Sequence, residues 1–185
     1  MALILHSRTG ARIVGGVPGV AEVDEARDAG VTTLRLDTAS FDAPGADMRW
    51  VADIPTLRTV FLHDRVRTPD IASMRGSAVD ELCVWTPGAS PVRSEDVGWL
   101  RRIDCEEASF ASDGWVDLSD VVTLQIGRVR EDEVRIGDAS DRLEFLKLRG
   151  RSQTARIVWS RPPHRLGTFM THSVRWSDLD DLARC

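Results

Sequence analysis

Three residues of the sequence carry side chains that together could perform nucleophilic catalysis: His63, Cys83 and Asp104. A thiolate, a histidine base and a carboxylate that orients the base are a common set for this chemistry. Each of the three belongs to one of three successive apolar segments. His63 stands at the seventh position of its segment and Cys83 at the fifth of the next, which separates their backbones by about 8 Å in adjacent strands. This spacing disfavours catalysis, and an enzyme that uses a Cys/His/carboxylate cluster is the alternative prediction.

The sequence gives less support for a metal-binding site or a phosphate-binding loop. The histidines show no paired spacing such as H-x-x-x-H; they are His6, His63, His164 and His172. The acidic group of Glu81, Asp104, Glu106 and Glu107 is typical of a solvated surface. The run GVPG at 16–19 lacks the Gly-Lys-Ser/Thr that completes a phosphate-binding loop. We predict neither a metal nor a cofactor.

Composition excludes further classes. The 185 residues carry a net charge of −5, whereas nucleic-acid binding requires a basic face that releases phosphate counterions. No apolar run is long enough to span a bilayer, and the N-terminus lacks the basic region of a secretory signal. The three cysteines are widely spaced, without a C-x-x-C pair. We therefore expect a cytoplasmic protein that binds neither nucleic acid nor membrane, with an oligomeric state that the sequence does not reveal.

The residues above are positioned by a repeated segment. Seven hexamers share the pattern apolar-x-x-apolar-x-apolar, and their fourth residues are spaced 21 to 26 residues apart. The fourth and sixth positions lie on one face of a strand. One such strand cannot bury its apolar face alone, so a fixed period of this length predicts stacked parallel strands. The fourth residues are Leu34, Val60, Leu82, Ile103, Leu124, Leu146 and Phe169.

This period resembles that of leucine-rich repeat proteins, whose pattern is L-x-x-L-x-L-x-x-N-x-L. The resemblance covers about residues 31–172 and is degenerate, because the chain contains no Asn. It implies an α/β fold: a solenoid with a parallel sheet, short helices or loops on the convex side, and capped ends. The alternative is an α/β sheet whose strands are evenly spaced by chance.

A single domain, 1–185, is expected. Residues 1–30 form the N-terminal cap, with a hairpin of 2–5 and 11–14 followed by a helix at 20–30. Residues 31–172 hold the repeats, and 173–185 form the C-terminal cap as a helix. Within the repeats, 69–75 predicts a short helical return, whereas 41–50 and 86–98 predict loops. Brief alternation at 132–138 and 155–160 indicates short strands.

The resemblance places hexamer positions three, five and seven on the concave side. Aromatic side chains ringed by charges there are typical of a protein-binding surface. We predict that Phe61 and Trp85 form an apolar patch with charged neighbours. The full set of predicted partner-binding residues is Arg35, Asp37, Phe61, His63, Glu81, Trp85, Arg102, Asp104, Glu106, Phe145, Lys147 and Arg149.

The predicted function is non-enzymatic binding of another protein. A short, acidic chain without an export signal is similar to bacterial immunity proteins, which bind and neutralise a cognate toxin in the cytosol. The resemblance therefore implies a toxin domain as the partner. Besides the enzyme, a scaffold subunit of a larger assembly is a further alternative.

Overall fold

A computed structural model describes residues 2–5, 10–14, 16–37, 45–63, 69–85, 94–106, 120–129, 133–136, 142–159 and 163–176. The chain divides into two compact units, Met1–Val92 (the first unit) and Arg93–Cys185 (the second unit). In both, parallel strands predominate and helices are few. The α/β class expected from the sequence is thereby confirmed. That residues 1–185 form a single domain stays a prediction.

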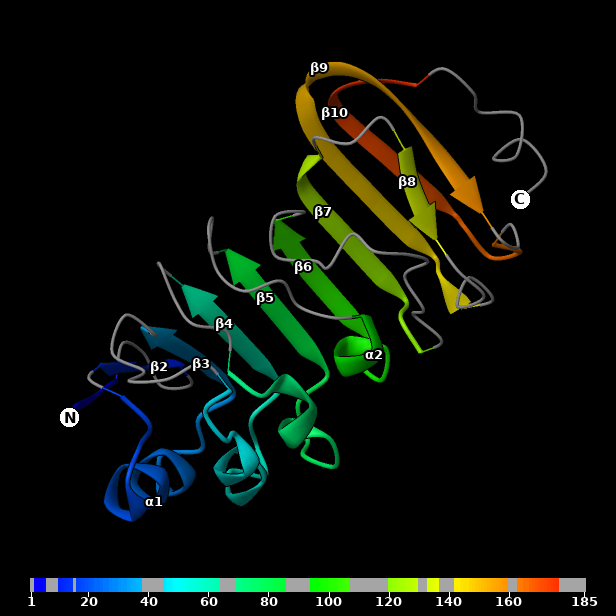
Figure 1. Ribbon diagram of the computed structural model, residues 1–185. Helices are drawn as coiled ribbons and strands as arrows, with labels where there is room; N and C mark the ends of the chain where they lie inside the picture. Colours follow the sequence, from blue (N-terminus) through cyan, green and yellow to red (C-terminus); the bar gives the residue numbers. More distant parts are fainter. Residues whose placement is uncertain are drawn as a thin grey trace. The chain divides into compact units, whose positions relative to one another are not determined.

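The first unit contains a sheet with the strand order β1-β2-β3-β4-β5 (Figure 1). β1 and β2 are antiparallel, as the predicted hairpin requires, with Ala2 opposite Val14 and Leu5 opposite Ala11. From β2 onward every pair is parallel. The strands are β1 (Ala2–Leu5), β2 (Gly10–Val14), β3 (Thr33–Asp37), β4 (Thr59–His63) and β5 (Glu81–Trp85).

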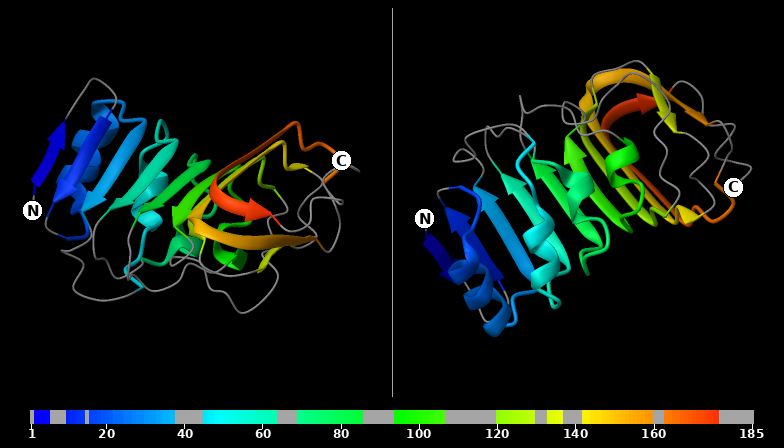
Figure 2. Two further views of the ribbon diagram at one scale, coloured as in Figure 1. Left: turned by 90° about the horizontal axis from the view of Figure 1, so that it is seen from above. Right: turned by 60° about the horizontal axis from the view of Figure 1, so that its bottom comes forward.

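Among the described residues, each connection from β2 to β5 contains one helical segment. These segments are α1 (Val20–Asp28), η2 (Arg49–Asp53) and η3 (Ile71–Met74). α1 contacts η2, and η2 contacts η3, so the three lie in a row on one side of the sheet (Figure 2). α1 ends just before Gly30, whose φ of 65° is a left-handed conformation that favours glycine. The helices predicted at 20–30 and 69–75 are confirmed, the second as a 3-10 turn.

The repeated apolar positions form the core of the first unit. Leu34 pairs in register with Val60, and Val60 with Leu82. All three side chains are fully buried. The sixth hexamer positions, Leu36, Leu62 and Val84, form a second buried row. Val23 and Ala26 of α1 and Val51 of η2 are also buried, which fixes the helical row against the sheet.

A repeated hydrogen-bond arrangement sets the register where the strands begin. The carbonyl of Thr32 accepts the N–H groups of both Arg58 and Thr59, at 2.9 and 3.1 Å. The carbonyl of Arg58 accepts those of Asp80 and Glu81 in the same way, at 3.0 and 3.1 Å. Since each acceptor is the second residue of its hexamer, every strand enters the sheet at an equivalent point.

The second unit also contains a sheet of parallel strands. Its sheet has the order β6-β7-β9-β10, all parallel, and β8 pairs with the C-terminal part of β9. Ile103, Leu124 and Leu146 form the buried fourth-position row, and the half-buried Phe169 continues it. The elements are α2 (Ser94–Val97), β6 (Arg102–Glu106), β7 (Thr123–Val129), β8 (Glu133–Ile136), β9 (Phe145–Trp159) and β10 (Thr168–Trp176).

Two local predictions need correction. Residues 155–159 are not a separate short strand but the end of the 15-residue β9, because no proline interrupts the extended backbone after Phe145. The region 86–98 is not entirely a loop, since Ser94–Val97 is helical. The strand predicted at 132–138 is confirmed as β8. The helix predicted at the C-terminus lies outside the described residues, as do residues 41–44 of the predicted 41–50 loop.

Candidate functional site

Hexamer positions three, five and seven of the first unit share the sheet face opposite the helical row, because positions four and six point into the core. We call this the first face. The third positions Thr33, Thr59 and Glu81 are in register across it. The Thr59 hydroxyl donates a hydrogen bond of 3.0 Å to the Glu81 carboxylate. That bond holds the Glu81 carboxylate beside β4 at this end of the face.

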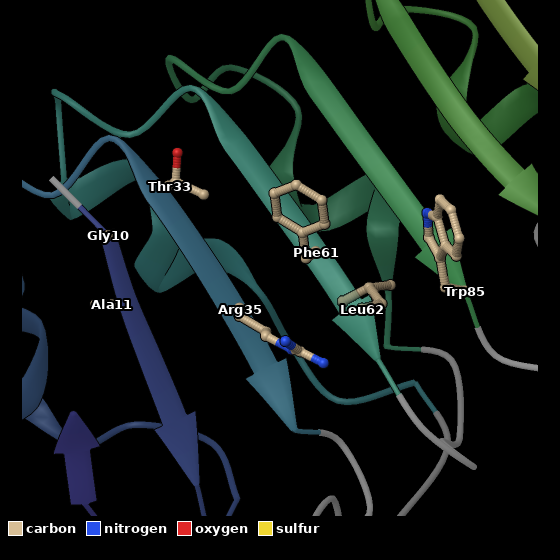
Figure 3. Close-up of a pocket in the computed structure, with 7 residues that line it drawn as sticks. All are labelled: Gly10, Ala11, Thr33, Arg35, Phe61, Leu62 and Trp85. Carbon is tan, nitrogen blue, oxygen red and sulfur yellow. The ribbon is translucent and has the colours of Figure 1, made fainter. Parts of the chain in front are cut away.

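A hollow of about 390 Å³ opens on this face (Figure 3). Phe61 stands on β4 and Trp85 on the neighbouring β5, two positions further along the chain direction. Trp85 is 41% exposed, which is unusual for so large an apolar side chain. The lining residues are Gly10, Ala11, Thr33, Arg35, Phe61, Leu62 and Trp85.

Arg35 gives the hollow its charge. It lies directly beside Phe61 in the sheet register, and its side chain is exposed. Among the described residues that line the hollow, none carries a carboxylate. Among the described side chains, none forms an ion pair with Arg35. The first face therefore presents two aromatic rings and a guanidinium that forms no ion pair with a described side chain.

The structure thus brings together three of the predicted partner-binding residues, Arg35, Phe61 and Trp85. Glu81 lies on the same face but not in the hollow. The backbones of Asp37 and His63 lie in register with Trp85, whereas their side chains lie outside the described part of the chain.

Sequence reasoning missed part of the hollow. β2 adds Gly10 and Ala11, with Gly10 directly beside Thr33. β2 lacks the hexamer pattern, so nothing in the repeat indicated that it extends this face. The absence of a side chain at Gly10 is a signal that could have been used, because it leaves space beside Thr33.

The remaining predicted residues lie on the corresponding face of the second unit, the second face. Arg102 and Phe145 are both third-position residues, and each pairs in register with Thr123 between them. Asp104 forms an ion pair with Arg149 at 4.0 Å. Gln125 lies in register between Asp104 and Lys147. The backbone of Glu106 lies opposite Gly127, and its side chain is outside the described residues. That these residues bind a partner stays a prediction.

Cys83 corrects the expectation of an exposed thiol. It occupies a facing position, yet its exposure is only 4%. The larger Phe61 lies beside it in the register, and Glu81 and Trp85 flank it on its own strand. A small side chain among such neighbours is covered. A buried thiol is poorly placed to attack a substrate. Cys105, predicted as a buried apolar residue, is 1% exposed.

Other ligand chemistry receives no support from the described residues. Within the described ranges, no group of three or more His, Cys, Asp or Glu side chains is arranged to hold a metal ion. No helix in the same ranges is both long and apolar enough to cross a membrane.

Comparison with protein-family models, with curated proteins and with solved structures finds no match to this chain.

Proposed function

We propose that the protein is a non-enzymatic recognition module that binds another protein through the first face. We further infer that its two units are parts of a leucine-rich-repeat-like solenoid. The period of 21 to 26 residues supports this inference. So does the double hydrogen bond onto Thr32, which recurs on Arg58, Arg101, Val122 and Glu144. Repeats of one supersecondary unit that stack only on their neighbours are the defining property of solenoids.

The observation that carries the function is the hollow on the first face, which Phe61 and Trp85 line. Large aromatic residues, together with arginine, dominate the binding energy of protein interfaces. An indole that is 41% exposed loses apolar contact with water when a partner covers it, which stabilises the complex. Two other residues of the same hollow are charged or polar, Arg35 and Thr33. They supply the hydrogen bonds that orient a partner.

The class of partner that we propose is a toxin domain, which the protein would neutralise by covering it. This step extends the similarity between a short acidic chain and bacterial immunity proteins. The immunity role predicts one further result: co-expression of the chain should relieve the toxicity of its partner. A partner that binds through the first face but is not toxic would retain the recognition function and reject the immunity role.

The test uses affinity capture of the partner followed by titration calorimetry. Trp85→Ala should weaken binding by about 2 kcal/mol or more, about 30-fold, while the protein stays folded. Met170→Ala is the matched control, because Met170 is 47% exposed and lies on the second face. We expect that change to leave the affinity within about threefold. Equal losses from both variants, or no loss from Trp85→Ala, would reject the first face as the binding surface.

A further inference from the structure

We propose that the hollow on the first face selects an acidic apolar anchor: a partner segment in which an aromatic or large aliphatic side chain stands next to a carboxylate. This inference rests on the proposed function and names the chemistry of the partner. The apolar group would fill the hollow against Phe61 and Trp85, and the carboxylate would bind Arg35.

The dimensions and walls of the hollow suit the apolar part of such an anchor. Its volume of about 390 Å³ lies in the range of sites that hold compact organic groups. Most of the lining is apolar, and the two aromatic rings supply its large apolar side chains, since Ala11 and Leu62 are buried toward the core. Aromatic walls favour an aromatic or large aliphatic guest over a polar one, since polar groups lose hydration without gaining partners.

The charge of the hollow determines which polar group the anchor carries. The guanidinium of Arg35 presents donors in a fork that matches the two oxygens of a carboxylate. Thr33 adds a hydroxyl, and Arg35 is the only charged residue among the lining residues that the structure describes. Because no described side chain forms an ion pair with Arg35, a partner carboxylate would not have to displace an internal one.

The same arrangement rejects a basic anchor. A lysine or arginine next to the apolar group would bring a like charge toward Arg35, with no carboxylate in the described part of the lining to compensate. The net charge of −5 acts on the approach of a whole partner, over roughly a Debye length of about 10 Å at 0.1 M salt. Arg35 acts at contact, so it decides which segment of the partner docks.

The experiment uses two blocked synthetic peptides, Gly-Asp-Phe-Glu-Gly and Gly-Lys-Phe-Lys-Gly, titrated into the full-length protein. The indole N–H signal of Trp85, assigned with a Trp85→Phe variant, reports on binding by NMR. We expect the acidic peptide to bind at least about tenfold more tightly than the basic one. Arg35→Gln should abolish this preference. Arg102→Gln, a change of an exposed arginine on the second face, should leave it intact.

Three outcomes would overturn the proposal: equal binding of the two peptides, a preference that survives in Arg35→Gln, or no response of Trp85 to either peptide. Failure of the proposed function gives a different result, because it appears as a captured partner whose affinity does not depend on Trp85. A partner that depends on Trp85 together with peptides that show no charge preference would reject the acidic anchor alone.

Discussion

The first and second faces share a backbone plan but differ in how their charges are satisfied. In both units the fourth and sixth hexamer positions are buried, except in the last hexamer, and the third, fifth and seventh face away from the core. On the first face, Arg35 has no ion-pair partner among the described side chains and borders an aromatic hollow. On the second face, Asp104 pairs with Arg149. A repeated scaffold therefore leaves its facing residues free to diverge, and this difference is the reason why the proposed function is assigned to the first face.

The largest expected effect concerns the buried row of fourth hexamer positions, which both units contain. Leu82→Ala in the first unit and Leu124→Ala in the second should each lower the free energy of unfolding by about 2–5 kcal/mol, because both side chains are fully buried. Urea denaturation measures the loss. Val20→Ala, at a position 79% exposed, serves as the control and should stay within about 0.5 kcal/mol of the wild type. A small loss at either leucine would refute the equivalence of the two rows.

A second prediction separates the two faces with matched aromatic residues. Phe61 lines the hollow of the first face, and Phe145 is a half-buried residue of the second. Phe61→Ala should weaken partner binding by about 1–2 kcal/mol, whereas Phe145→Ala should have little effect. Titration calorimetry gives both values, and melting curves correct for any loss of folding. A larger effect at Phe145 would move the binding surface to the second unit.

The third prediction sets recognition against catalysis. Cys83→Ser should leave partner binding and biological activity essentially intact, because the thiol is covered and not used. It should cost about 1 kcal/mol of stability, since a hydroxyl replaces a thiol at a buried position. Activity assays beside urea denaturation test both parts. A fall in activity by several orders of magnitude would favour the alternative in which Cys83 is a nucleophile.

The smallest effect is electrostatic and concerns η2 of the first unit, in the helical row opposite the first face. Hydrogen bonds from Arg49, first from its side chain and then from its backbone, hold the pKa of Asp47 below its ordinary value of 3.8. A carboxyl whose folded pKa is lowered adds stability above its unfolded pKa, and this is lost as the pH falls through the folded value. NMR titration of the Asp47 carboxyl should show the lowered pKa, and Arg49→Gln should return it toward 3.8. An unchanged pKa in that variant would contradict the assignment.

The sequence was sufficient to predict the repeat because three apolar positions recur in each hexamer. Val60, for example, was placed correctly between Leu34 and Leu82 from spacing alone. The same periodicity predicted that Phe61 and Trp85 lie diagonally across adjacent strands. The solenoid itself and the binding of a partner remain proposals.

What the sequence could not predict depends on neighbours rather than on period. Cys83 occupies a facing position, and only the larger residues around it explain its burial. Gly10 and Ala11 line the hollow because β2 pairs with β3 in parallel. The sequence did not predict this pairing, because β2 lacks the hexamer pattern. The length of β9 depends likewise on its pairing with both β8 and β10.

An NMR footprint of the captured partner on the isotope-labelled protein tests the role of the first face most directly. Each face has an exposed apolar residue that can report on binding, Trp85 on the first face and Met170 on the second. The signals observed are the indole N–H of Trp85 and the methyl group of Met170. We predict that the partner shifts or broadens the Trp85 signal at stoichiometric concentration and leaves the Met170 signal in place. A Met170 signal that changes while the Trp85 signal does not would contradict recognition through the first face.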